Sequence, residues 1–479
     1  MIRSSVRLTG IRINDFKNVA NGELSFINPK RGYRASIVGL YGQNGSGKTS
    51  LINALSVLKF LMCGFPVPPK YADFISVDSD SSRITYDFSV AAEDDPDVIM
   101  HPGKDDALAD AETVSVRYEV CLRRRETGGG LEADGTVTEG QAGVEVCSEE
   151  LSFSLKSENR NIAKNVLISS GEGNAFGPKA KFSVLTGGRR GMSTEVLVAK
   201  RLALASSRSF VFSPELLGIV RDNCTCPLYR DIFERLSVFG RRELFVIDTA
   251  AAGRISLNAL PLVIGDGKRG SVVVSLDDGA VVPVSSIPTV RGVIDNMNIV
   301  LPEIIPGLKI GIREMGSQLL PDGSDGVKFQ LVSYKAAKEI ALKYESEGIK
   351  KIVAILQLLI AVYNNDSITV AVDELDAGVF EYLLGEILRI ISEKGKGQLV
   401  FTSHNLRPLE TLDTGFVAFT TTDPANRYTR PAGTGRIRNL RDYYYRDMVL
   451  GDRKSGVYEP TRNAEIALAF REAGEYFDS

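Results

Sequence analysis

The fold class of this chain is decided by the stretch Gly42-Gln43-Asn44-Gly45-Ser46-Gly47-Lys48-Thr49, which fits the pattern G-x-x-x-x-G-K-[ST]. An apolar run from Ala35 to Tyr41 precedes it, and helical spacing from Ser50 to Phe60 follows it. In this strand–loop–helix context, the backbone N–H groups at the helix N-terminus bind phosphates. The glycines let the backbone close around the phosphates without a Cβ in the way. The stretch therefore predicts an α/β fold with a nucleotide site.

Two side chains of this loop are expected to act on the nucleotide. Lys48 would reach the β- and γ-phosphates as a point charge, and the Thr49 hydroxyl would ligate Mg²⁺. The residues that we expect to bind the nucleotide are Gly42, Asn44, Gly45, Ser46, Gly47, Lys48, Thr49 and Ser50.

A pair of carboxylates much later in the chain supplies the second half of the predicted site. Ile368 to Val372 is a continuous apolar run that ends in Asp373-Glu374. A carboxylate at the C-terminal end of such a strand lies beside the phosphate loop in an α/β sheet. We expect Asp373 to hold Mg²⁺, directly or through water, and Glu374 to orient or deprotonate the attacking water. The alternative is an acidic pair that caps the helix expected from Ala377 to Glu393.

The next strand adds a histidine. Residues 398–402 form an apolar strand that ends in Ser403-His404. The strand–helix–strand order places His404 near Glu374 on the same edge of the sheet. We interpret His404 as a γ-phosphate contact, and the alternative is a structural histidine. The other histidine of the chain, His101, lies in an acidic loop and is not expected to take part.

A resemblance emerges once the segment between these halves is included. There, Ser346-Glu347-Gly348-Ile349 opens an apolar helix over residues 352–362. A phosphate loop, a Ser-x-Gly helix start, an Asp-Glu strand and a strand ending in His is the order of ABC-class ATPases. The chain resembles the members that are not transporters: the RecF- and SMC-like heads, and above all the ATPases of bacterial abortive-infection and phage-defence systems related to the overcoming-lysogenisation-defect family. The resemblance covers residues 6–64 and about 308–420.

The resemblance implies an ATP-hydrolysing P-loop head of the ABC type, in which a mixed sheet with flanking helices carries an antiparallel β-subdomain and a mixed α+β insertion. Two heads would pack head to tail around ATP and Mg²⁺. Ser346 and Gly348 of one head, with Glu347 between them, would present a hydroxyl and helix N-terminal N–H groups to the γ-phosphate on the other. Asp376 would lie at this dimer interface. An ordinary helix N-cap explains Ser346 and Glu347 equally well and is compatible with this role.

Two departures from the transporter ATPases argue against a transporter subunit. Those enzymes usually carry Leu-Ser-Gly-Gly-Gln at the signature after a short stretch, whereas this chain has Glu347 and a long insertion. The lid glutamine of the family has no assignable counterpart. Gln43 lies inside the phosphate loop, and Gln141 lies in a Gly-rich loop.

The composition is that of an ordinary globular protein, with 43% hydrophobic and 24% charged residues among 479. The net charge is −3, so any nucleic-acid affinity has to come from a local patch. No apolar run is long enough to span a bilayer, the N-terminus does not read as a signal peptide, and the five cysteines form no even framework. We therefore expect a cytoplasmic protein without a membrane partner.

The order of these features divides the chain into consecutive parts. They are residues 1–64, the N-terminal half of the head with the phosphate loop; 65–185, a β-rich part of the head with exposed loops; 186–307, a mixed helical and strand insertion; 308–425, the C-terminal half with the signature, the Asp-Glu strand and the His switch; and 426–479, a basic, Tyr-rich tail. No sustained heptad is visible, so a long coiled-coil arm is not expected.

The tail interleaves basic residues with Tyr443-Tyr444-Tyr445. Arginines among aromatics can follow a nucleic-acid backbone while the rings stack on bases. The alternative is that the tyrosines pack on the head and the arginines are solvated or paired. The basic residues are Arg427, Arg430, Arg436, Arg438, Arg441, Arg446, Arg453 and Lys454.

The sequence as a whole predicts a Mg²⁺-dependent ATPase that dimerises with a second copy of itself around ATP. We expect it to regulate a protein effector or toxin, in anti-phage defence. The chain ends too soon after His404 for the nuclease domain of the lysogenisation-defect relatives, so no nuclease activity of its own is expected. The alternatives are a RecF/SMC-like ATPase of DNA repair or chromosome maintenance that binds DNA, and a nucleotide-gated scaffold that holds a toxin with little turnover.

Overall fold

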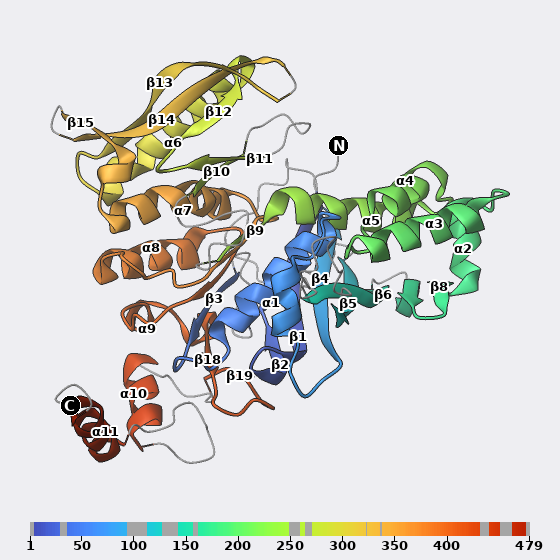
Figure 1. The fold of residues 1–479 in the computed structure, drawn as a ribbon, viewed down its shortest axis with the longest axis horizontal. Helices are drawn as coiled ribbons and strands as arrows, with labels where there is room; N and C mark the ends of the chain where they lie inside the picture. Colours follow the sequence, from blue (N-terminus) through green and yellow to red (C-terminus); the bar gives the residue numbers. More distant parts are fainter. Residues whose placement is uncertain are drawn as a thin grey trace, which may run out of the picture.

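The computed structural model of this chain has an α/β fold, with helices on both faces of a mostly parallel sheet and a large antiparallel sheet beside it (Figure 1). The predicted fold class, a mixed sheet with flanking helices and an antiparallel subdomain, is thereby confirmed. His101, Gln141, Arg436, Arg438, Arg453 and Lys454 lie outside the described residues. The structure describes residues 4–28, 36–92, 113–126, 142–156, 161–248, 259–263, 271–321, 323–335, 338–431, 440–450 and 462–475.

The parallel sheet has the strand order β19-β18-β3-β17-β16-β9. Its first five strands in chain order run parallel to one another, so their C-terminal ends meet at one edge of the sheet. Every residue of β16, β17 and β18 is buried, as expected for parallel strands that are covered on both faces. The strands are β3 (Ser36–Tyr41), β9 (Leu244–Ile247), β16 (Thr369–Val372), β17 (Gln398–Thr402), β18 (Val417–Thr420) and the antiparallel edge strand β19 (Tyr428–Thr429).

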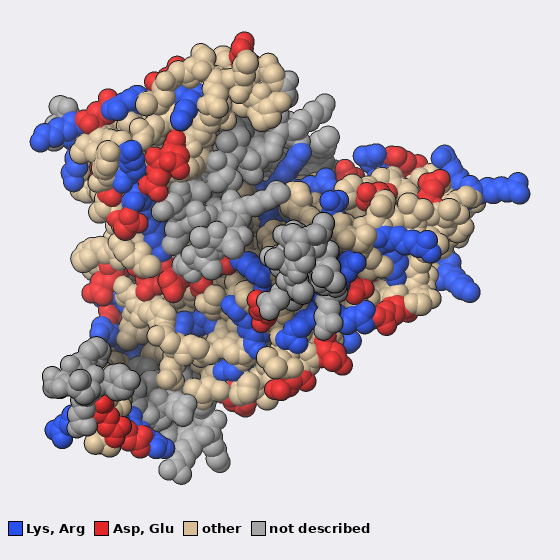
Figure 2. Space-filling model, viewed as in Figure 1, with Lys and Arg blue, Asp and Glu red and all other residues tan. Residues whose placement is uncertain are grey.

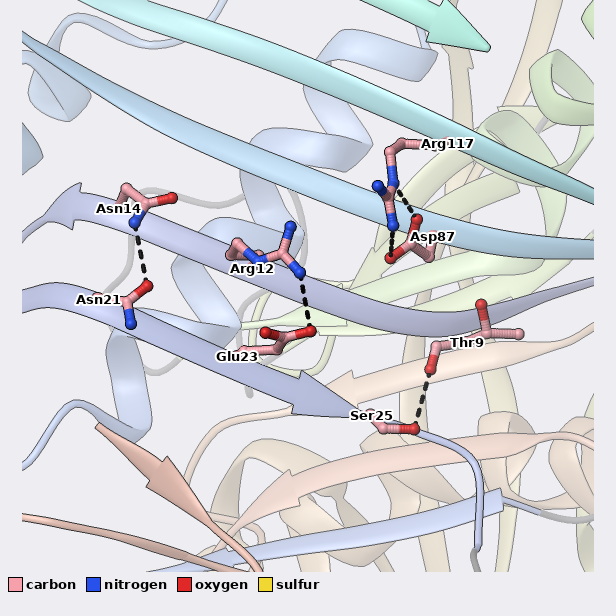
Figure 3. A network of polar contacts seen from close by, with 8 residues as sticks. All are labelled: Thr9, Arg12, Asn14, Asn21, Glu23, Ser25, Asp87 and Arg117. Atoms are coloured by element: carbon pink, nitrogen blue, oxygen red, sulfur yellow. Dashed lines mark hydrogen bonds and ion pairs between the residues drawn. The ribbon is translucent and has the colours of Figure 1, made fainter. Parts of the chain in front are cut away.

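The antiparallel sheet has seven strands in the order β2-β1-β4-β5-β6-β7-β8. Strand alternation gives it one apolar and one polar face: Ile11 and Ile13 of β1 are buried, whereas Arg12 between them pairs with Glu23 at 2.9 Å (Figure 3). The strands are β1 (Ser4–Phe16), β2 (Val19–Ser25), β4 (Ser81–Ala92), β5 (Thr113–Glu126), β6 (Ala142–Lys156), β7 (Asn161–Gly171) and β8 (Asn174–Gly177).

Helix α1 (Lys48–Met62) lies between the two sheets and belongs to one hydrophobic core with both of them. It contacts β1 of the antiparallel sheet as well as β9, β16 and β17 of the parallel sheet. Successive side chains of a parallel strand point to opposite faces of the sheet, so they enter different hydrophobic cores. Val38 and Leu40 of β3 pack on the α1 side, whereas Ile37 and Tyr41 pack on the opposite side.

The opposite face of the parallel sheet is covered by helices and by a smaller sheet (Figure 1). The smaller sheet has the order β12-β14-β13, with β15 on β14, and a hairpin of β10 and β11 lies beside it. The elements are β10 (Ala259–Val263), β11 (Ser271–Ser275), β12 (Ala280–Pro283), α6 (Ile287–Ile304), β13 (Lys309–Leu319), β14 (Asp325–Lys335), β15 (Lys338–Ala341), α7 (Glu347–Asn364), α8 (Glu381–Lys394), α9 (Pro408–Thr411) and α10 (Leu440–Leu450). A further helix, α11 (Asn463–Glu475), follows in the chain and is exposed.

A helical unit follows the antiparallel sheet and leads back to β9, the strand that residues 186–307 contribute to the parallel sheet. The unit is attached through Glu149 of β6, which is only 5% exposed. Its carboxylate accepts hydrogen bonds from Tyr118, from Ser209 and from the backbone N–H groups of Phe210 (2.7 Å) and Val211 (3.4 Å). The helices are α2 (Lys179–Thr186), α3 (Met192–Ala205), α4 (Pro214–Asn223) and α5 (Pro227–Val238).

We expect Glu149→Ala to lower the free energy of unfolding by about 3 kcal/mol, because it leaves buried donors without an acceptor. Glu149→Gln is the matched control and should cost less than about 1 kcal/mol. Its amide oxygen can accept the backbone N–H groups, and its NH₂ can donate to the two hydroxyls after they rotate. Urea unfolding followed by circular dichroism measures both variants. Equal stability of Glu149→Ala and the wild type would contradict this role for the carboxylate.

Candidate nucleotide-binding site

A cavity of about 380 Å³ lies where the phosphate loop meets the C-terminal ends of β16 and β17. Its size lies within the range of small-ligand pockets. It brings together residues from three distant parts of the sequence: the β1–β2 hairpin, the loop into α1, and the ends of the two central strands. The lining residues are Lys17, Asn18, Asn44, Gly45, Gly47, Lys48, Thr49, Ser50, Asp373, Glu374, Thr402 and His404.

The phosphate loop depends on two glycines in left-handed conformations. Gly45 has φ 78°, and Gly47, the N-cap of α1, has φ 94°. These values disfavour any residue with a Cβ. A Cβ on Gly42 would overlap the Thr420 hydroxyl, which also contacts Ser46. Gly42 and Ser46 therefore shape the loop from behind and do not line the cavity.

Lys48 lies across the loop and brings its charge to the cavity. Its Nζ donates to the carbonyl oxygens of Gly42 (2.7 Å) and Gln43 (2.9 Å). Burial lowers the pKa of Lys48, and the carboxylates of Asp373, Asp376 and Glu374 oppose that shift. An ammonium group in this position can replace the carbonyl contacts by contacts to phosphate oxygens.

The residues predicted to hold Mg²⁺ lie next to each other. The Thr49 hydroxyl donates to Asp373 Oδ1 at 3.4 Å, and the Thr402 hydroxyl donates to the same oxygen at 2.6 Å. Asp373 is 1% exposed as a residue. A hydroxyl and a carboxylate are hard oxygen donors, and Mg²⁺ is usually bound by one or two such protein groups together with substrate phosphates. The donor set at this position therefore fits Mg²⁺.

Glu374 has an unusual backbone conformation for a residue with a side chain, with φ 48°. Its N–H donates to the Thr402 hydroxyl at 2.7 Å, and its carbonyl accepts from Ala377 N at 3.0 Å and from Lys351 Nζ. Such a conformation persists only where several contacts determine it, and it is common at functional sites. The side chain of Glu374 lines the cavity.

The side chain of Asp376 accepts a hydrogen bond from the backbone N–H of His404. His404 is exposed and lines the cavity. Its N–H and that of Asn405 donate to Asp376 Oδ2 at 3.0 and 2.9 Å. Asp376 thus fixes the turn after β17 within its own chain and orients the residue that carries the imidazole.

The signature residues lie outside this cavity, at the exposed start of α7. Ser346 is the N-cap of α7, and its hydroxyl accepts from Ile349 N at 3.4 Å. Glu347 forms an ion pair with Lys350 at 2.6 Å. Gly348 packs against the loop that follows Glu374, and a Cβ on Gly348 would overlap the carbonyl oxygen of Gly378. Within one chain, Ser346, Glu347 and Gly348 do not face the phosphate loop.

Sequence patterns did not point to several residues around the cavity. Lys17 donates to Asn53 Oδ1 at 2.6 Å, and Asn53 donates to Asp248 Oδ2 at 3.2 Å. Asp248 is buried and directly follows β9, beside Asp373 on the next strand. Asn18 contacts the Gly45 carbonyl and accepts from the Ser50 hydroxyl. No local motif marks these residues, because long-range packing of the β1–β2 hairpin and of β9 places them here.

The described part of the tail packs on the head. Arg427 is buried and donates to the carbonyl oxygens of Thr421 (2.7 Å) and Asn18. Arg430 donates to the carbonyl oxygens of Gly415 and Ser25, and Arg441 pairs with Glu410. The rings of Tyr443 and Tyr444 stack on Phe419, with centroids 6.2 and 5.0 Å away. These contacts favour the packing interpretation of this part of the tail over a nucleic-acid surface.

We expect Lys48→Met to weaken binding of ATP in the presence of Mg²⁺ by about 10- to 100-fold, because the variant loses a charged hydrogen-bond donor and keeps the length of the side chain. Equilibrium binding of a fluorescent ATP analogue measures the effect. Lys394→Met, at the exposed C-terminal end of α8, is the matched control and should bind as the wild type does. Equal affinity of Lys48→Met and the control would rule out the phosphate-loop assignment.

Comparison with known proteins gives a distant likeness. No model of a protein family and no curated protein matches the sequence. Similar solved structures include the Smc head bound to the C-winged helix domain of ScpA, with 13% identity over 89% of this chain and 98% of that one and a TM-score of 0.38. The SMC head domain from Thermotoga maritima has 12% identity, coverages of 89% and 100%, and a TM-score of 0.33. RecF with ATP has 12% identity, coverages of 90% and 100%, and a TM-score of 0.36. Among the described residues, no helix is long and apolar enough to cross a membrane.

Proposed function

We propose that this protein is an ABC-class ATPase that binds ATP with Mg²⁺ and hydrolyses it to ADP and phosphate. The observation that carries the proposal is one cavity that gathers Lys48, Thr49, Asp373, Glu374 and His404. These residues come from a phosphate loop and from the ends of two adjacent parallel strands. Ligands bind at this edge in open α/β sheets. An anion-binding loop beside two carboxylates is suited to phosphoryl transfer to water.

Each residue then has a defined task. The loop N–H groups and Lys48 bind the β- and γ-phosphates, and Thr49 and Asp373 would hold Mg²⁺, which would supply positive charge beside the phosphates. Glu374 orients the attacking water and accepts its proton. The imidazole of His404 contacts the γ-phosphate. Because Asp373 and Glu374 both bond to Thr402, the metal ligand and the base keep a fixed separation.

We propose further that two copies of the chain join head to tail around ATP. Ser346 and Glu347 are exposed at the N-terminus of α7 and do not line the nucleotide cavity of their own chain. The Ser346 hydroxyl uses a lone pair for the N-cap and retains its proton to donate. Tyr344 and Phe380, which flank the Gly348–Gly378 contact in sequence, are 74% and 70% exposed. Aromatic residues are enriched in protein–protein interfaces.

The regulated partner that we favour is a protein effector or toxin, in bacterial anti-phage defence. This part of the proposal rests on the resemblance of the motifs to defence ATPases. A DNA-binding role of the RecF/SMC kind receives less support from the described tail, where Arg427 and Arg430 donate to backbone carbonyls. On the face shown in Figure 2, basic and acidic side chains are interspersed. A scaffold that holds a toxin with little turnover would make little use of Glu374 as a base.

Glu374→Gln should keep ATP affinity and lose turnover by about 10²- to 10⁴-fold, because the amide keeps the shape of the side chain but cannot accept a proton. Steady-state phosphate release, with and without duplex DNA, measures the effect. Glu393→Gln, at the far end of α8, is the matched control and should turn over ATP normally. Normal turnover of Glu374→Gln would exclude Glu374 as the base. A strong rise of wild-type turnover with DNA would favour the DNA-repair function instead of the effector.

The dimer has its own test, because Glu374→Gln should accumulate ATP-bound molecules. We expect this variant to elute from gel filtration as a dimer with ATP and Mg²⁺ and as a monomer without them. Adding Ser346→Arg should abolish the dimer while ATP affinity of the monomer is kept, since Ser346 lies outside the cavity. A dimer that forms without ATP, or one that tolerates Ser346→Arg, would contradict the head-to-tail arrangement.

A further inference from the structure

The side chain of Lys351 joins the helix that Ser346 opens to the carboxylate that faces the cavity. Lys351 lies in the second turn of α7, is 4% exposed, and donates from Nζ to the backbone carbonyl of Glu374. We propose that Lys351 is a positioning residue that holds Glu374 in its reactive conformation and makes this conformation depend on the position of α7. This inference rests on the ATPase function proposed above.

The backbone of Glu374 requires such support. A left-handed conformation at a residue with a Cβ costs on the order of 1–3 kcal/mol and needs contacts that determine it. The N–H side is fixed by the Thr402 hydroxyl at 2.7 Å. On the carbonyl side, Ala377 belongs to the same loop, whereas Lys351 comes from a separate helix. On its carbonyl side, Glu374 is therefore tied to an element outside its own loop by Lys351.

A charged amine at this buried position costs desolvation free energy unless it is paired or hydrogen-bonded. Burial lowers the pKa of Lys351 to about 8, although the carboxylates of Asp376, Glu374 and Asp373 act in the opposite direction. An apolar side chain such as Met would fill the same space without this desolvation cost. Packing alone thus does not account for a lysine here, whereas donation to the Glu374 carbonyl does.

The start of α7 is coupled to the same loop by direct packing. Gly348 approaches Gly378 so closely that a Cβ would overlap the Gly378 carbonyl oxygen, and Gly378 itself has φ 75°. The first two turns of α7 thus contact both ends of the loop, because Gly348 lies against Gly378 and Lys351 donates to Glu374. A shift of α7, when Ser346 meets the γ-phosphate of the partner head, is transmitted to Glu374 of its own head.

Lys351→Met tests the inference, because the variant keeps the volume of the side chain and removes the donor. We expect kcat to fall on the order of 10²-fold, as for a small misplacement of a catalytic group, while ATP affinity and the ATP-dependent dimer are kept. Lys394→Met is the matched control with normal kcat. Lys351→Gln keeps an N–H donor and should recover part of the lost turnover. If Lys351→Met does not fold, Lys351→Gln alone should show a reduced kcat at unchanged affinity.

The double variant Lys351→Met/Glu374→Gln separates positioning from a general structural defect. If Lys351 acts through Glu374, kcat of the double variant equals that of Glu374→Gln, because effects of residues that act as a unit are not additive. Additive losses would overturn the inference, as would normal kcat in Lys351→Met or loss of its ATP-dependent dimer. Failure of the ATPase proposal is recognised separately, since wild-type turnover would then not exceed that of Glu374→Gln.

Discussion

The Thr402 hydroxyl is the contact on which the geometry of the site depends. It donates to Asp373 Oδ1 and accepts from Glu374 N, so it fixes the two acidic residues relative to β17. This is possible because β16 and β17 are parallel and in a register that ends both strands at the same edge, next to β3 and the phosphate loop. A residue that belongs to neither predicted motif thereby sets the distance between the metal ligand and the base.

Two buried lysines, each on a different helix, lie near the acidic residues. Lys48 belongs to the first turn of α1, and Lys351 to the second turn of α7. Burial lowers the pKa of each, and the same three carboxylates, those of Asp373, Glu374 and Asp376, oppose this shift in both cases. The site is therefore a compact arrangement of opposite charges before any phosphate is bound. A phosphate that attracts Lys48 therefore also changes the electrostatic interaction of Lys48 with Glu374 and Asp376.

Most of the fold could be predicted because its signals are local. The glycine pattern of the phosphate loop and the apolar runs of β16 and β17 predicted an α/β fold, and the structure confirms it. Lys17, Thr402 and Lys351 could not be predicted, since their positions follow from the packing of β1–β2, of β17 against β16 and of α7 on the sheet. The spacing of arginines in the tail could not distinguish a nucleic-acid surface from packing on the head, for a related reason. An arginine that donates to buried carbonyls, as Arg427 does, has the same sequence pattern as one that faces a phosphate backbone.

The position of α1 has a mechanical consequence. Its N-terminus forms the phosphate loop, and its body, about 22 Å long for the 15 residues of the helix, is packed against both large sheets. Through α1, the phosphate loop is connected by direct packing to both large sheets. The helical unit attached through Glu149 packs on β8, the strand at the outer edge of the antiparallel sheet (Figure 1). Packed contacts therefore run without a break from the phosphate loop to a surface far from it, and a change in the position of α1 would reach that surface through the antiparallel sheet.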